Sequence, residues 1–535
     1  MKTVLASLAV LCAATLTAQV SETIDVRIIN VDVTVTSKGA PVRGLTRDNF
    51  EVFEDGRRQS ITNFYTSEET SPVAAVAAVT PGATQAATQV PIQPDPRFRR
   101  KVLVLVDSQH TTRHARDIAL RELETMINDR FHGDYEWSIG VIGRGVKLVL
   151  PLSSDKNAIH EALEVIRTSG TRSGSTTFAG AVEREGKTLP PTQTELTTAM
   201  RFDADYFNRL NMAQASDDTE RVIAAQFTVP AIVDAARGFA SAPGRKIVFF
   251  LTGDPGLNDI EPVSQGGADG FRVRNVSPFD QETIWALRKK IIQEANASDV
   301  SFYIWNVEGL MAPGDMTGAP MTNNSAVFWL ANQTGGRLVA GNDPAKAVQE
   351  FDTASSAFYS LGYSPSHPDD GKYHEISVRL KQKGDYKLEY RTGYSSNPTA
   401  TQLARAMKSP TAAAMQPTGL PVTLAMGTAS TDRGEVTVPI EVKVPFHALQ
   451  FLPGKNGVAA NLVVYVSVFN DVGKNLVATS IPLTPGFKAG SPDPNGMLVW
   501  HNSIKMTKGE RNRVVVAIRD TVTDSIGMAT QVVRF

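Results

Sequence analysis

Two kinds of hydrophobic pattern divide this chain of 535 residues. Residues 24–37 alternate apolar and polar side chains, which is the period of a strand with one buried face. A second short strand pattern at 49–56 ends in an Asp-Gly turn. Val102–Val106 is instead a continuous apolar run, typical of a strand buried on both faces. We therefore expect a small β unit over 19–66, followed by a domain with a buried sheet.

Strand and helix patterns alternate through residues 99–354. Apolar side chains at three-and-four spacing mark helices, for example at 281–297, and buried strand patterns recur at 247–251 and 300–305. This alternation predicts an α/β domain with a doubly wound, mostly parallel sheet covered on both faces. Residues 186–220 break the rhythm, and we expect them to form an insertion on the loop edge of the sheet.

The regions that flank this domain are rich in strand patterns. Residues 421–535 carry several of them, at spacings that predict a C-terminal β-sandwich. Residues 355–396 carry three more, and we expect them to pair with 19–66 although about 290 residues lie between. The segments 67–98 and 397–420 are rich in Ala, Pro and Thr and are predicted to be linkers.

The N-terminus has the layout of a secretory signal peptide. Lys2 gives a positive start, Val4–Leu16 is almost wholly apolar, and the small residue Ala18 precedes Gln19. We expect cleavage after Ala18, so that residues 1–18 are removed. No later apolar run reaches the roughly 18 residues that a transmembrane helix needs. The sequence thus predicts an exported protein, periplasmic or extracellular, with no transmembrane span.

Cysteine content and net charge limit the kinds of functional site and partner that the sequence predicts. The chain has one cysteine, Cys12, which lies inside the predicted signal peptide. The mature chain would then hold no disulfide, no thiolate metal site and no cysteine nucleophile. A formal net charge of -1 gives no reason to expect nucleic acid as a partner.

Three loop motifs stand next to predicted strands and helices. Asp107-Ser108-Gln109-His110-Thr111 ends the first buried strand, Gly174-Ser175-Thr176-Thr177 begins a later helix, and Thr252-Gly253-Asp254 ends the strand at 247–251. These loops resemble the three metal-site loops of von Willebrand factor A-type domains. In that family the first loop reads Asp-x-Ser-x-Ser and the third Thr-Asp-Gly, so Gln109, Thr111 and Asp254 depart from the pattern.

The wider sequence is similar to a bacterial group abundant in Acidobacteria, the VWFA-related family. The resemblance covers roughly residues 25–396 and does not extend over the last 140 or so residues. The matching stretches are Val42-Arg43-Gly44-Leu45-Thr46, Phe50-Glu51-Val52-Phe53-Glu54-Asp55-Gly56, Pro243-Gly244-Arg245-Lys246, Tyr359-Ser360-Leu361-Gly362-Tyr363-Ser364-Pro365, Gly371-Lys372-Tyr373-His374 and Arg391-Thr392-Gly393-Tyr394.

The resemblance implies a ligand site at the loop edge of the α/β domain. Mg²⁺ prefers oxygen ligands and keeps several waters, and a partner's carboxylate could complete its coordination. The implied metal ligands are Asp107, Thr111, Thr176 and Asp254, and the implied ligand-binding edge is formed by Ser108, Gln109, His110, Ser175, Thr177 and Gly253. The residues themselves leave a second interpretation open, in which Asp107 caps the next helix or accepts loop backbone donors without a metal.

Motifs for catalysis are missing from the sequence. There is no Gly-x-Ser-x-Gly elbow and no phosphate-binding glycine loop. His110 and His114 are four residues apart, but they lack the Glu and the third ligand of a zinc site. We expect Trp305 and Trp329 to lie in the core.

The leading prediction is an exported, adhesion-type module that binds a protein ligand and is not an enzyme. A secreted metal-dependent hydrolase that uses Asp107, His110 and Asp254 is the alternative from another class. A structural envelope component without an active metal site is a third hypothesis.

Overall fold

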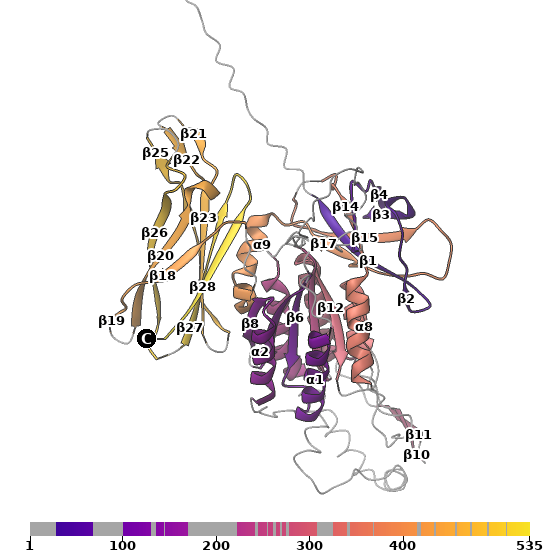
Figure 1. Cartoon of the computed structure of the whole chain (residues 1–535). Helices are drawn as coiled ribbons and strands as arrows, with labels where there is room; N and C mark the ends of the chain where they lie inside the picture. Colours follow the sequence, from indigo (N-terminus) through magenta and orange to yellow (C-terminus); the bar gives the residue numbers. More distant parts are fainter. Residues whose placement is uncertain are drawn as a thin grey trace, which may run out of the picture.

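A computed structural model shows three parts: a β domain, an α/β domain and a C-terminal β domain (Figure 1). Apart from brief internal gaps, it describes residues 28–67, 100–129, 135–168, 222–307, 325–414 and 419–534. The predicted signal peptide, nearly all of the linker at 67–98 and the insertion at 186–220 lie outside the described residues. No helix in the described ranges is long and apolar enough to cross a membrane.

The α/β domain is built on a six-stranded mixed sheet in the order β13-β12-β9-β6-β7-β8. All neighbouring strands run parallel except β7 and β8, which are antiparallel. Every residue of β6 is buried, as the continuous apolar run predicts. The strands are β6 (Arg100–Asp107), β7 (Tyr135–Ile142), β8 (Val146–Ser153), β9 (Lys246–Thr252), β12 (Val300–Asn306) and β13 (Leu338–Val339).

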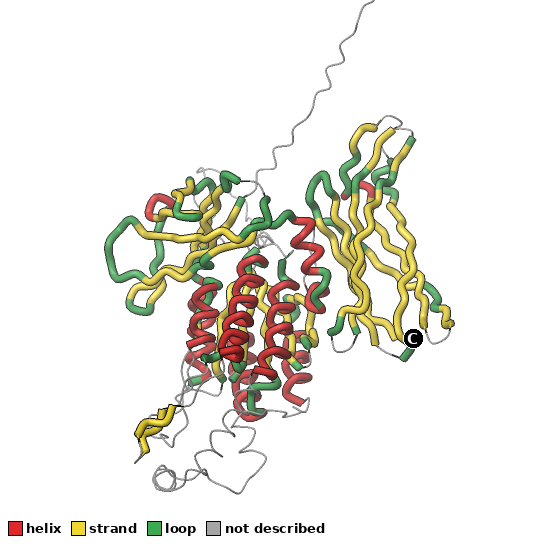
Figure 2. Tube along the Cα trace, turned by 180° about the vertical axis from the view of Figure 1, so that it is seen from behind, coloured by secondary structure: helices red, strands yellow, loops and turns green. Residues whose placement is uncertain are grey.

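Helices cover both faces of this sheet (Figure 2). Alternate residues of β6 explain why: Val104 packs in one apolar core and Leu105 in the other, so neither face can be left to water. One face is covered by α1 (Arg113–Asp129), α2 (Lys156–Thr168) and α8 (Pro344–Ser356), and the other by a helix at 222–238, α6 (Pro278–Ala297) and α7 (Ser325–Gln333). A mixed α/β fold is confirmed.

A two-stranded hairpin lies between β9 and α6. Its strands β10 (Ser264–Gly267) and β11 (Gly270–Val273) pair antiparallel. In Figure 1 this hairpin lies at the end of the α/β domain that is opposite the N-terminal β domain.

The N-terminal β domain is made from two segments that flank the α/β domain in the chain. One sheet has the order β16-β1-β14-β5 with β2 beside β1, and the other has the order β17-β15-β3-β4. Val33 lies opposite Tyr359, and Val52 opposite Val378. The strands are β1 (Ile29–Ser37), β2 (Ala40–Pro41), β3 (Phe50–Glu54), β4 (Arg57–Gln59), β5 (Asn63–Thr66), β14 (Tyr359–Tyr363), β15 (Tyr373–Leu380), β16 (Lys387–Glu389) and β17 (Gly393–Ser395), with a short 3-10 helix η1 (Arg47–Asn49). The segments 19–66 and 355–396 therefore share both sheets.

Buried arginines join this β domain to the α/β domain. Arg391 donates to the backbone oxygens of Asn296 (3.3 Å) and Asn30 (2.6 Å), and it forms an ion pair with Asp299 at 2.9 Å. Arg337 binds Glu389 of β16 at 2.8 Å. These contacts hold the β domain against the end of the sheet where β9 and β12 begin. The β domain therefore does not contact the opposite end, where these strands finish.

The described part of the segment at 397–420 forms two short packed helices, where its composition predicts a linker. It contains α9 (Thr399–Ala406) and a 3-10 helix, η3 (Pro410–Ala414). Leu403, Ala406 and Met407 are fully or almost fully buried. Their spacing of three and four residues forms an apolar stripe that the Ala-, Pro- and Thr-rich composition obscured. Leu403 and Met407 join the core between the helix at 222–238 and the C-terminal domain.

Two antiparallel four-stranded sheets with one shared core make the C-terminal domain. The first contains β18 (Thr423–Met426), β19 (Ser430–Asp432), β20 (Glu435–Pro445) and β26 (Met497–Thr507). The second contains β23 (Leu462–Phe469), β24 (Asn475–Leu483), β27 (Arg511–Asp520) and β28 (Ile526–Arg534). A smaller sheet at one end is formed by β21 (Leu452–Gly454), β22 (Gly457–Ala459) and β25 (Gly486–Phe487), and η4 (Phe446–Ala448) follows β20.

Replacing Arg391 should weaken the packing of the N-terminal β domain against the α/β domain. Arg391→Ala is expected to lower the free energy of unfolding by about 3 kcal/mol, because two backbone oxygens and a carboxylate lose a charged donor. Arg391→Lys should recover little, since one ammonium cannot reach all three acceptors. Urea denaturation measures the effect. Lys443→Ala, at an exposed pair with Glu441, is the control and should change stability by less than about 0.5 kcal/mol; a similarly small change for Arg391→Ala would contradict the assignment.

Candidate functional site

The sheet brings two of the three motif loops together at the strand ends. Asp107 is the last residue of β6 and Thr252 the last of β9, and these strands are parallel neighbours. The chain order reverses here, because β7 and β8 lie on one side of β6 while β9, β12 and β13 lie on the other. Ligands of open α/β sheets collect beyond the strand ends at such a switch point.

Asp107 is fully buried and its carboxylate is bound by four donors. Oδ1 accepts from the backbone N–H groups of Gln109 (3.0 Å) and His110 (3.2 Å). Oδ2 lies 2.9 Å from His110 Nδ1 and accepts from the Thr252 hydroxyl at 2.8 Å. An ionised carboxylate offers about four lone-pair sites, so loop and strand donors use all of them.

These donors keep Asp107 ionised. Burial by itself raises the pKa of the carboxyl group, but the charge and hydrogen bond of His110 and the bonds from Thr252 and Gln109 outweigh it and hold the pKa below its ordinary value of 3.8. All of these partners stabilise the charged form. Asp107 therefore organises its own loop by accepting backbone donors from it.

The other predicted site residues have different environments. The Thr111 hydroxyl donates to the backbone oxygen of Asp107, and Gln109 Nε2 donates to the backbone oxygen of Gly143. Ser108 is partly buried and Gly253 is buried. Thr176, Asp254, Ser175 and Thr177 lie outside the described residues.

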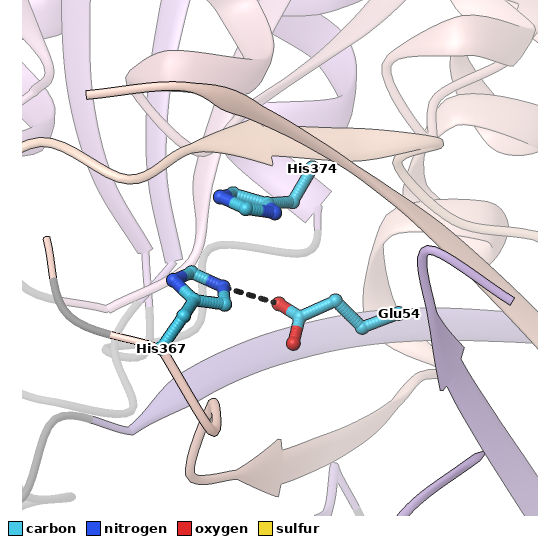
Figure 3. A group of neighbouring side chains, drawn as sticks. All are labelled: Glu54, His367 and His374. Carbon is cyan, nitrogen blue, oxygen red and sulfur yellow. Dashed lines mark hydrogen bonds and ion pairs between the residues drawn. The ribbon is translucent and has the colours of Figure 1, made fainter. Parts of the chain in front are cut away.

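A second polar cluster was missed by the sequence reasoning. Glu54 at the end of β3, His374 in β15 and His367 in the loop between β14 and β15 lie side by side (Figure 3). Each offers one oxygen or nitrogen, and these three atoms lie within 4.8 Å of one another. The imidazole rings stack with centroids 3.9 Å apart and planes 16° apart. Antiparallel pairing of β3 with β15 places Glu54 opposite Ile376, two residues from His374 on the same face.

Tyrosines hydrogen-bond to Glu54 in this cluster. The hydroxyls of Tyr363 and Tyr394 donate to Glu54 Oε1 at 3.1 and 2.5 Å, and His367 Nε2 lies 3.4 Å from the same oxygen. Burial, reinforced by the Glu54 charge, raises the pKa of Tyr363. Tyr363 therefore stays protonated and acts as a donor.

Carboxylates surround His374. Its Nδ1 lies 2.8 Å from Asp55 and its Nε2 lies 3.2 Å from Asp370. Burial opposes the charge of His374, but these hydrogen bonds outweigh burial and raise its pKa. A hydrogen bond from the Lys372 backbone, together with His374, lowers the pKa of Asp370 to about 2. Since carboxylates only accept, both ring nitrogens carry protons in this arrangement.

The cluster has a signal in the sequence that is visible only in hindsight. Glu54, Asp55, Tyr363, His374 and Tyr394 come from four of the stretches that carry the family resemblance. The stretch that holds Glu54 lies about 300 residues before the other three, and no local spacing relates it to them. The pairing of β1, β3, β14 and β15 brings them to one place.

Exposed apolar side chains lie on the three helices that cover one face of the sheet. As crossover helices between parallel strands, α6 and α7 run antiparallel to the strands, so they begin at the strands' carboxyl ends. We call the following set the aromatic patch: Ile223, Phe227, Phe279, Trp285, Phe328 and Trp329, with exposed fractions from 43% to 73%. Trp305 is buried as expected, but the expectation for Trp329 is wrong. Leu330 and its apolar neighbours already supply the buried side of α7.

No family model matches the sequence, and no curated protein matches it. Among solved structures the chain is similar to an aerotolerance-related membrane protein from Bacteroides fragilis, with 11% identity over 48% of this chain and 97% of that chain, at a TM-score of 0.25. It is also similar to BatB from Bacteroides thetaiotaomicron, with 10% identity over 48% of this chain and 98% of that chain, at a TM-score of 0.22. It is similar as well to a putative β-galactosidase from Bacteroides fragilis, with 12% identity over 34% of this chain and 23% of that chain, at a TM-score of 0.16. Likenesses of this size carry no argument about function, which must come from the chain's own residues.

Replacing Asp107 should destabilise the α/β domain in a pH-dependent way. Asp107→Asn is expected to lower the free energy of unfolding by about 3 kcal/mol at pH 7, because it removes the buried charge that faces His110. The lowered pKa means that this contribution is complete above about pH 4 and is lost as the pH falls through the folded-state value.

Urea denaturation at pH 7 and pH 3 measures this difference. Asp155→Asn is the control, since Asp155 accepts from the Asn157 backbone before α2 and asparagine is an equally good helix cap. An Asp107→Asn variant whose deficit stays constant between the two pH values would contradict the assigned role.

Proposed function

We propose that this chain is an exported binding module built around a von Willebrand factor A-type domain, which docks a protein ligand at the loop edge of its six-stranded sheet. The strand order supports the proposal, because the reversal between β6 and β9 places Asp107 and Thr252 where ligands of such sheets collect. The N-terminal β domain packs at the opposite end of the strands and does not cover this edge.

The aromatic patch is the observation that carries the proposal. Phe279, Phe227 and Trp285 are 73%, 63% and 62% exposed, which is costly for side chains of this size in water. Aromatic side chains are enriched where protein partners bind, and exposed apolar clusters mark such surfaces. A ligand that covers the N-terminal halves of α6 and α7 and the first described residues of the helix at 222–238 would bury them.

The environment of Asp107 favours docking without a metal bridge. Its four hydrogen bonds would have to break before the carboxylate could bind Mg²⁺. We propose that the Asp107 loop acts as a rigid support for the ligand edge. Capture of a partner's carboxylate through Mg²⁺ is the competing mechanism.

Burial argues against a hydrolase at this position. The side chains of His110 and Asp107 are 4% and 0% exposed, so a substrate would not reach the pair in this arrangement. A general base has to lie within hydrogen-bond reach of the proton that it removes. The pair is better suited to fixing the loop. A structural envelope component would share this fold, and it differs from the proposed module by having no ligand at the aromatic patch.

Site-specific photo-crosslinking tests the docking surface. A photo-reactive phenylalanine analogue at position 285, expressed in the cells that make this protein, should give one discrete adduct. Phe279→Ala and Phe328→Ala in the same chain should abolish that adduct, because the ligand loses its apolar contacts.

The matched control carries the analogue at position 165. Val165 is an exposed apolar residue, 53% accessible, on α2 at the other face of the sheet. Equal adducts from both positions, or an adduct that survives the alanine changes, would rule out the patch as the docking surface. An adduct of twice the chain mass would identify the ligand as a second copy of this chain.

Calorimetry separates the two mechanisms at the loop edge. Titration of Mg²⁺, Mn²⁺ and Ca²⁺ into the wild type and into Asp107→Ala should give the same heats, because Asp107 already has a full set of donors. A binding heat that is present in the wild type and lost in Asp107→Ala would favour the Mg²⁺-bridged mechanism instead.

A further inference from the structure

The Glu54 carboxylate is buried without a full compensating charge. Its side chain is 3% exposed, and among the described residues its only ion-pair partner is His367, at 3.4 Å. Its hydrogen bonds all reach Oε1, two of them from tyrosine hydroxyls. Burying a carboxylate in this way is costly unless a cation compensates it. The other oxygen, Oε2, can still accept a ligand.

The three side chains offer donors that suit a transition metal. Two imidazole nitrogens and one carboxylate oxygen lie within 4.8 Å of one another. In a tetrahedral zinc site, ligand atoms about 2.1 Å from the ion are about 3.4 Å apart, so side-chain rotation would have to bring the three atoms closer together. Imidazole selects Zn²⁺ over Mg²⁺ and Ca²⁺, which prefer oxygen ligands alone.

His374 is already oriented in the way that zinc-bound histidines are. Such a histidine usually donates its second ring N–H to a carboxylate, which fixes the ring. Here Asp55 and Asp370 each face one ring nitrogen, at 2.8 and 3.2 Å. Whichever nitrogen binds an ion and releases its proton, the other keeps a carboxylate partner. Asp55 is fixed in turn, because its Oδ1 accepts from the Glu375 backbone at 2.9 Å.

His367 is the ligand that has to move. Its ring is stacked on His374, and two parallel rings cannot both direct a lone pair at one ion between them. Its side chain is 22% exposed and lies in a loop outside β14 and β15. Rotation about its own side-chain bonds can therefore open the stack without disturbing the paired strands.

We propose that Glu54, His367 and His374 bind one Zn²⁺ ion, with water in the fourth position. The ion joins β3 to β15 and to the loop before it, so it links segments that lie more than 300 residues apart in the chain. Binding to the folded state alone would stabilise the pairing of the two halves of the N-terminal β domain. The site is separate from the loop edge and does not depend on the ligand proposed there.

Titration of Zn²⁺ into the full-length protein after treatment with EDTA tests the site. Calorimetry should show one ion per chain with a dissociation constant in the micromolar range or tighter, and the melting temperature should rise. Co²⁺ in place of Zn²⁺ should give visible absorption bands. His367→Ala and Glu54→Gln should each weaken Zn²⁺ binding by about tenfold or more.

Two controls make the result specific. His501→Ala removes a histidine of β26 that is 70% exposed, and Asp155→Asn changes the cap before α2; neither should change Zn²⁺ affinity. Far-UV circular dichroism verifies the fold of each variant, and His367→Ala is the decisive one because it lies in a loop. Absence of Zn²⁺ binding to the wild type, or unchanged affinity in a folded His367→Ala variant, would overturn the proposal.

Discussion

The antiparallel pairing of β1 with β14 is the constraint on which the rest of the structure depends. Val33 lies opposite Tyr359, so the two ends of the α/β domain are held at one sheet. This closure has to be achieved across more than 300 residues, and its entropic cost grows only slowly with length. Once it is made, β3 and β15 pair as well, and a single apolar core forms from both segments.

Buried charge then fixes how the two domains meet. Arg391 binds backbone oxygens on both sides of the boundary, at Asn30 and Asn296, while Arg245 forms an ion pair across it with Asp32 at 3.8 Å. Guanidinium groups suit this position, because they direct several donors in fixed directions. A polar boundary of this kind specifies one orientation, which an apolar boundary would constrain less. The β domain therefore occupies the end of the sheet where β9 begins and does not contact the other end.

Histidine–carboxylate contacts occur in both candidate sites, with different consequences. At the loop edge, His110 and three further donors saturate the buried Asp107 carboxylate, which gives a rigid support with no remaining acceptor capacity. Beside β15, His374 has carboxylates on both nitrogens, while the neighbouring Glu54 carboxylate has only a partial counter-charge. The first arrangement is electrostatically complete and the second is not. This difference is why we propose a supporting role for the first and metal binding for the second.

The sequence by itself determined the kinds of element and their order. The unbroken apolar run at Val102–Val106 requires that both faces of its strand are buried. The flanking strands alternate apolar and polar residues, so they require burial of one face only. Both requirements follow from the residues of each strand alone. The sequence also placed Asp107 at the end of a strand. Only the tertiary structure decided what these residues contact: the Thr252 hydroxyl reaches Asp107 from 145 positions away, and strand register sets Glu54 beside His374. Such meetings depend on long-range strand pairing and register, which no local pattern encodes.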